Sequence, residues 1–90
     1  MQRFFVNVKG RVQGVGFRYF CRETALDLGV CGWVKNESDG SVSLEAQAHE
    51  DILKEYFDKV SKGPSSSRVS DFIKSKSPCV EHETGFSIRY

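Results

Sequence analysis

The sequence contains few of the residues on which disulfide-rich domains and metal sites depend. Its three cysteines, Cys21, Cys31 and Cys79, are odd in number and include no CxxC pair, a pattern that fits neither a disulfide framework nor a zinc site. The two histidines, His49 and His82, each lie among acidic residues, which favours solvated side chains over metal ligation. We therefore expect no metal and no other cofactor.

Long apolar runs are also missing. No stretch approaches the roughly 18–20 apolar residues that a membrane span needs. The first nine residues lack the apolar core of a signal peptide, so we expect a cytoplasmic protein with no membrane partner. The 90 residues are 39% hydrophobic and 28% charged, which excludes a disordered or fibrous segment and favours a single domain over residues 1–90.

The net charge is small, but the charges are unevenly distributed. Thirteen basic and twelve acidic residues are too balanced for a dedicated nucleic-acid-binding protein, so no nucleic-acid partner is expected. Residues 1–22 nevertheless hold five basic and no acidic residues, whereas the rest of the chain holds eight basic and twelve acidic ones. This asymmetry indicates either that the N-terminal quarter faces a small anion or that these are scattered surface charges. Charge alone leaves both interpretations open.

The hydrophobic pattern alternates between the period of two that is typical of half-buried strands and the helical period of about 3.6. The turn residues Ser38-Asp39-Gly40 predict a hairpin, and the three glycines between Gly10 and Gly16 are expected to end the first strand. The predicted strands cover residues 4–9, 30–36, 42–47, 69–74 and 86–90, and the predicted helices cover residues 17–28 and 50–62.

This order, β-α-β-β-α-β with a short extra terminal strand, predicts an α+β fold. Two strand–helix–strand units of this length fold most simply as split βαβ units. We therefore expect an antiparallel sheet covered on one face by two helices.

A glycine-rich loop between the first strand and the first helix is the best candidate for a functional site. Gly14 and Gly16 allow the backbone to curl so that successive amides converge on one point, next to the positive end of the helix. Arg18 lies at the head of that helix, where its guanidinium could close over a bound phosphate. The alternative is an ordinary turn that uses glycine for steric reasons.

Several segments resemble the acylphosphatase family over essentially the whole chain. GRVQGVGFR at residues 10–18 is similar to the main signature of that family, and GWVKN at residues 32–36 with DGSV at residues 39–42 is similar to its second signature. Gly63-Pro64 followed by Arg68-Val69, and the closing FSIRY at residues 86–90, also resemble it. The resemblance implies a ferredoxin-like α/β sandwich, in agreement with the predicted order of elements.

Position by position, the resemblance also assigns functional residues. It implies that Arg18 is the catalytic arginine and that Asn36 orients the attacking water. The implied phosphate-binding loop comprises Gln13, Gly14, Val15, Gly16, Phe17 and Arg18. One departure is Ala48, which follows Gln47 where many members have glycine. If that position needs a positive φ, alanine there would cost about 1 kcal/mol.

The implied activity is metal-independent hydrolysis of acyl phosphates to a carboxylate and inorganic phosphate, by in-line attack of a water molecule. Its partners would be a small-molecule acyl phosphate and inorganic phosphate, the latter as product and inhibitor, and we expect a monomer. Two alternatives remain. One is a phosphate- or acyl-phosphate-sensing domain without turnover, or a stand-alone relative of the acylphosphatase-like domain of hydrogenase maturation proteins. The other is an RNA-binding module of the same fold, because residues 16–20 (GFRYF) weakly resemble an RNA-binding strand motif, although their aromatics continue in helical spacing.

Overall fold

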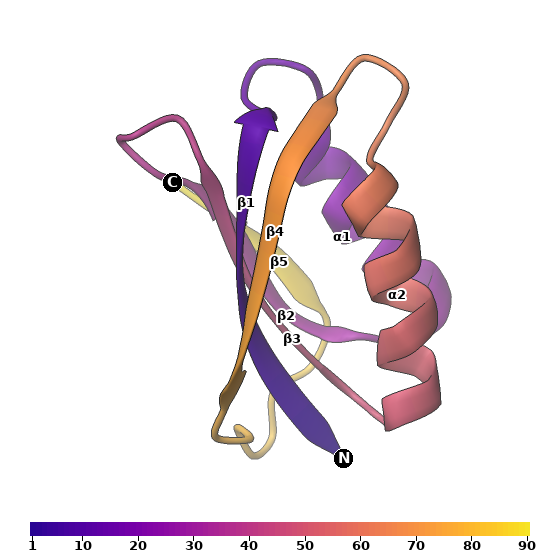
Figure 1. The fold of residues 1–90 in the computed structure, drawn as a ribbon. Coiled ribbons are helices and arrows are strands. Elements are labelled where there is room, and N and C mark those ends of the chain that lie inside the picture. The colour runs from indigo at the N-terminus through magenta and orange to yellow at the C-terminus, as the bar shows by residue number, and fades with distance from the viewer.

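The computed structural model describes residues 1–90 and contains five strands and two helices in the order β-α-β-β-α-β-β (Figure 1). The predicted helices have the observed boundaries, and every predicted strand is present. The elements are β1 (Gln2–Arg11), α1 (Phe17–Leu28), β2 (Cys31–Asn36), β3 (Val42–Ala48), α2 (Glu50–Lys62), β4 (Arg68–Ser77) and β5 (Phe86–Arg89).

The five strands form one sheet in the order β4-β1-β3-β2-β5. The pairs β1–β3, β1–β4 and β2–β3 are antiparallel, as expected, but β5 pairs with β2 in parallel. The sheet is therefore mixed rather than wholly antiparallel. The loop of residues 78–85 crosses from β4 at one edge of the sheet to the opposite edge. The short final strand there joins the free edge of β2 and runs parallel to it.

Both helices lie on the same face of the sheet, as the order of elements predicts (Figure 1). The core fills the space between them and the sheet as one cluster of 17 buried hydrophobic residues. Alternation along β1 directs Val6 and Val8 into this cluster, and the helical stripes supply Phe17, Cys21 and Tyr56. No helix is both long and apolar enough to cross a lipid bilayer.

The ends of α2 follow directly from its sequence. Glu50 and Asp51 occupy the first turn and Lys59 and Lys62 the last, which places each charge near the favourable end of the helix dipole. The helix stops at Gly63, whose amide donates to the carbonyl oxygen of Lys59 at 3.1 Å.

The first strand does not end at Gly10, contrary to the sequence-based expectation. β1 continues to Arg11 through a register shift between Lys9 and Gly10, and Gly10 has a φ of 124°. A Cβ at this position would collide with the carbonyl group of Arg68, so the glycine allows β4 to approach closely.

β4 is longer than predicted, at residues 68–77, because it pairs with β1 along almost its whole length. Ala48 is part of β3 and has no positive φ, so the expected strain is absent.

Candidate active site

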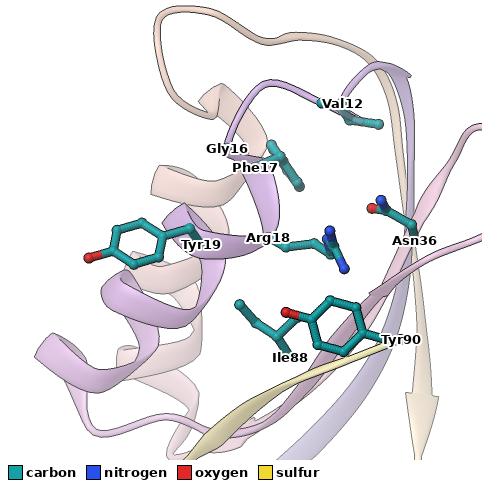
Figure 2. A pocket seen from close by; sticks show the side chains of 9 residues that line it. Val12, Gly16, Phe17, Arg18, Tyr19, Asn36, Ile88 and Tyr90 are labelled. Atoms are coloured by element: carbon teal, nitrogen blue, oxygen red, sulfur yellow. The ribbon is translucent and has the colours of Figure 1, made fainter.

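A pocket of about 280 Å³ opens where the loop between β1 and α1 faces the end of β2 and the C-terminus (Figure 2). Residues from three separate segments of the chain contribute to its walls. They are Val12, Gly14, Gly16, Phe17, Arg18, Tyr19, Asn36, Ile88 and Tyr90.

The loop exposes a set of unpartnered backbone amides to this pocket. Gly14 and Gly16 both have left-handed φ values, 72° and 79°, in open space where a side chain would meet no other atom. Glycine is therefore needed there for its backbone conformation rather than for room. The amides of residues 13–16 donate no hydrogen bond within the protein. The first turn of α1 has neither a side-chain cap nor an acidic residue, so the positive end of the helix is free for an anion.

Arg18 brings a positive charge to the same pocket. Its side chain is half-buried and forms no ion pair with any carboxylate of the protein. Its guanidinium carbon lies 5.0 Å from the centre of the Tyr90 ring, a cation–π contact that supports the side chain without neutralising it. Figure 2 shows the guanidinium between Tyr90 and Asn36.

Asn36 occupies the opposite wall, at the last position of β2 (Figure 2). Its Oδ1 atom is the only buried side-chain nitrogen or oxygen in the structure without a hydrogen-bond partner. An unpaired buried carbonyl is unfavourable, so the Asn36 oxygen is the one buried side-chain acceptor that still lacks a donor. The pocket thus combines amide donors and a guanidinium with one free carboxamide acceptor.

The structure separates the predicted loop residues into two groups. Gly14, Gly16, Phe17 and Arg18 line the pocket together with Asn36, whereas Gln13 and Val15 do not. The Gln13 side chain instead donates from Nε2 to the carbonyl oxygens of Glu37 and Ser41, both at 2.8 Å. The Gln13 side chain therefore anchors the loop to the turn that follows Asn36, whereas its backbone amide forms no hydrogen bond within the protein.

Sequence reasoning missed four lining residues, Val12, Tyr19, Ile88 and Tyr90. For Ile88 and Tyr90 the sequence does contain a signal, because residues 86–90 resemble the closing segment of the family. That resemblance alone assigned them no role. Parallel pairing aligns Lys35 with Arg89, so the next residue on each strand, Asn36 and Tyr90, reaches the same end of the sheet.

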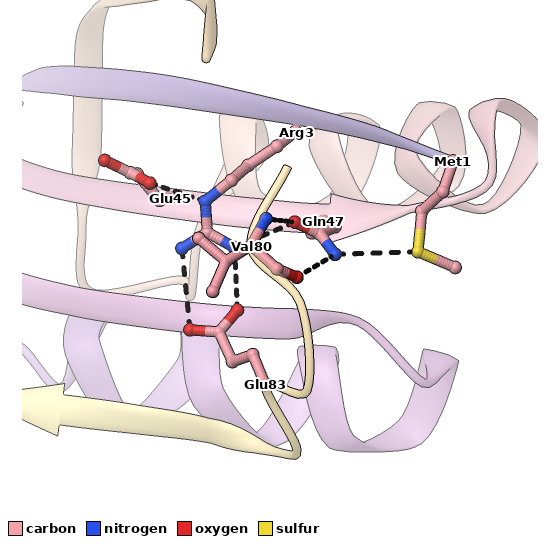
Figure 3. A network of polar contacts seen from close by, with 6 residues as sticks. All are labelled: Met1, Arg3, Glu45, Gln47, Val80 and Glu83. Atoms are coloured by element: carbon pink, nitrogen blue, oxygen red, sulfur yellow. Dashed lines mark hydrogen bonds and ion pairs between the residues drawn. The ribbon is translucent and has the colours of Figure 1, made fainter. Parts of the chain in front are cut away.

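Only one of the five basic residues in the N-terminal quarter, Arg18, lines the pocket. Arg3 lies on the other side of the sheet, almost fully buried, and its Nη1 donates to Glu83 at 2.7 Å while its Nε pairs with Glu45 (Figure 3). Burial alone would lower the pKa of Arg3, but the hydrogen bonds and charges of Glu83 and Glu45 outweigh it and raise that pKa. Of the two interpretations of the uneven charge, the one in which the N-terminal quarter faces an anion does not hold for Arg3.

No three His, Cys, Asp or Glu side chains lie close enough together to hold a metal ion. The charge available at the pocket is that of Arg18 and of the helix terminus.

Comparison with known proteins matches residues 4–88 to the family model described as Acylphosphatase. The chain belongs to the acylphosphatase family. It is 42% identical to an acylphosphatase of Oceanobacillus iheyensis over the full length of both proteins. Its structure superposes on the crystal structure of an acylphosphatase from Bacillus subtilis with a TM-score of 0.94 at 40% identity, covering all of both chains.

The acylphosphatase fold also occurs within a larger protein. Full-length HypF, solved in a phosphate- and nucleotide-bound form, matches 99% of this chain with a TM-score of 0.89 at 27% identity, but the match covers only 12% of HypF. The resemblance to an RNA-binding strand is not favoured. Residues 17–20 form the first turn of α1 and Phe17 is buried, so these aromatics are not displayed on a strand.

Proposed function

We propose that the protein hydrolyses acyl phosphates, and that the pocket between the glycine loop, Arg18 and Asn36 is its active site. The observation that carries the proposal is the meeting, in one pocket, of unpartnered loop amides, an unpaired guanidinium and an unpaired carboxamide oxygen. The first two groups are suited to a phosphate and the third to a water molecule.

In the proposed reaction the loop amides and Arg18 hold the phosphoryl oxygens. Asn36 accepts a hydrogen bond from a water molecule and holds it in line with the bond between phosphorus and the bridging oxygen. The water oxygen bonds to phosphorus as that bond breaks, and its electron pair leaves on the carboxylate. An acyl phosphate dianion and water thus give a carboxylate and dihydrogen phosphate, which loses a proton to solvent according to pH.

The leaving group explains why such a simple site suffices. A carboxylic acid has a pKa of about 4, so its anion leaves without a general acid. Phosphoryl transfer depends mainly on positioning and on stabilising the charge of the equatorial oxygens, which converging amides and one guanidinium provide. A phosphate monoester, whether alkyl or aryl, has a more basic leaving group than an acyl phosphate and would gain less from the same site.

The test is to assay the purified protein on acetyl phosphate and benzoyl phosphate, with p-nitrophenyl phosphate as the monoester comparison. We expect hydrolysis of both acyl phosphates and little of the monoester. Comparable rates on all three substrates would contradict the proposal. Binding of phosphate without turnover of any acyl phosphate would instead favour a sensing domain.

We further propose that residues 1–90 act as a single acylphosphatase domain, as a monomer, in the cytoplasm. One chain supplies all nine residues that line the pocket, so no second copy is needed to complete it. The three cysteines are all free thiols, which suits a reducing compartment. Size-exclusion chromatography with light scattering would test the oligomeric state.

A further inference from the structure

The loop between α2 and β4, residues 63–67, packs against the outside of the glycine loop. The Ser66 hydroxyl donates to the carbonyl oxygen of Val15 at 2.9 Å, across 51 residues of sequence. No backbone amide donates to that carbonyl, although it lies at the start of α1. Ser66 is therefore the hydrogen-bond partner that the protein provides for the Val15 carbonyl.

The orientation of one peptide group gives this contact its significance. The peptide bond between Val15 and Gly16 is trans, so the carbonyl of Val15 and the amide N–H of Gly16 point in opposite directions. Ser66 holds the carbonyl on the outer side of the loop, and Gly16 lines the pocket on the inner side.

We propose that Ser66 is a positioning residue, which keeps the Gly16 amide directed at the bound phosphate by anchoring the opposite end of the same peptide group. This inference rests on the proposed function, in that it assigns the phosphate to this loop. Ser66 itself touches no substrate, and its effect passes through the orientation of one donor.

The loop that carries Ser66 is itself held in place. The backbone amide and the hydroxyl of Ser67 both donate to the carbonyl of Pro64, at 2.9 and 2.8 Å, and close a tight turn around Ser66. At the base of the turn, a Cβ on Gly63 would lie only 3.1 Å from the Phe17 ring, so this segment already packs closely on the first residue of α1. The turn thus provides a fixed support from which the hydroxyl reaches the glycine loop.

Ser65 offers a matched control. It lies in the same turn, is exposed like Ser66, and forms no hydrogen bond within the protein. The variants Ser66→Ala and Ser65→Ala therefore remove the same atom from adjacent positions, and only the first disturbs the glycine loop. Ser66→Thr retains the hydroxyl and should restore the contact.

The experiment measures kcat, KM for acetyl phosphate and the inhibition constant of inorganic phosphate for the wild type and the three variants. Ser66→Ala should raise both KM and the inhibition constant by about two- to tenfold, the range for one neutral hydrogen bond. Ser65→Ala should match the wild type, and Ser66→Thr should lie within about twofold of it. A parallel titration with inorganic phosphate, followed by the NMR shift of the Gly16 amide, should show a smaller shift at saturation in Ser66→Ala.

The outcomes separate this inference from the proposed function. Phosphate affinity in Ser66→Ala equal to that of Ser65→Ala, or a Gly16 amide shift unchanged from the wild type, would overturn the role of Ser66. A wild-type protein that hydrolyses no acyl phosphate would refute the proposed function. The NMR titration still decides the role of Ser66 in that case, because it needs only phosphate binding.

Discussion

Removing Arg18 and removing Asn36 should damage the protein in different ways. Arg18→Ala removes the only basic side chain that lines the pocket. A hydrogen bond to a charged group contributes about 1.5–3 kcal/mol, so each bond lost should weaken phosphate binding by about 10- to 150-fold. Turnover should collapse as well, because in the proposed reaction the same guanidinium stabilises the charge of the transition state.

Asn36→Ala should leave phosphate binding nearly unchanged, since the loop amides and the guanidinium remain. In the proposed reaction the lost interaction is with the attacking water and acts in the transition state, so kcat should fall by about 10²–10³ with little change in the inhibition constant of phosphate. Both proteins should stay folded. The Asn36 oxygen that is removed has no partner to lose, and the contact of Arg18 with Tyr90 contributes only about 0.5–1 kcal/mol.

The assay combines steady-state kinetics on acetyl phosphate with phosphate inhibition, after circular dichroism has established that each variant is folded. Arg11→Ala is the control for charge alone, because Arg11 is an exposed basic residue next to the loop that does not line the pocket. It should cause only a small change that salt suppresses. If folded Asn36→Ala kept the wild-type kcat, or lost phosphate affinity as severely as Arg18→Ala, the role proposed for Asn36 would be wrong.

Four further outcomes are expected. Activity should survive excess EDTA, and inorganic phosphate should inhibit competitively; loss of activity with EDTA that added magnesium or zinc restores would refute a metal-free reaction. In thiol labelling of the native protein, exposed Cys79 should react readily and Cys21 only on unfolding, because burial raises the pKa of the Cys21 thiol. Hydrogen bonds from the Ser41 side chain and amide lower the pKa of Asp39, so by NMR this carboxyl should titrate below 3.8, and Ser41→Ala should raise its midpoint. The stabilisation from Asp39 is thus present at neutral pH and is lost only as the pH falls through that lowered value.

The sequence was sufficient to predict the elements whose limits are set locally. The boundaries of α2 follow from an apolar stripe, charges matched to the helix dipole and a terminal glycine, all within 14 residues. The course of β1 through Gly10 was not predictable in this way. Glycine is required there because a Cβ would collide with the carbonyl group of Arg68, 58 positions later in the sequence.

The residues of the candidate site also divide into those that a local motif predicts and those that depend on distant pairing. Gly14, Gly16 and Arg18 belong to one continuous motif, and their convergence could be predicted from the conformations that glycine permits and from the start of a helix. The contribution of Tyr90 depends on the parallel pairing of β5 with β2, which no local pattern indicates. The position of Arg3 could not be predicted for a related reason. Its partner Glu83 lies in a loop at the other end of the chain, and composition cannot show that the two charges meet.

The glycine loop combines two requirements that conflict locally. The proposed function requires its amides to remain unpaired so that they can bind an anion, and a backbone without internal hydrogen bonds has little of its own to keep it in one conformation. Contacts from outside the loop resolve the conflict. Gln13 fastens it to the turn after Asn36, and Ser66 fastens it to the loop after α2. Both use groups other than the backbone amides of the loop, so the loop is held in place while the donors that we propose for the anion stay free.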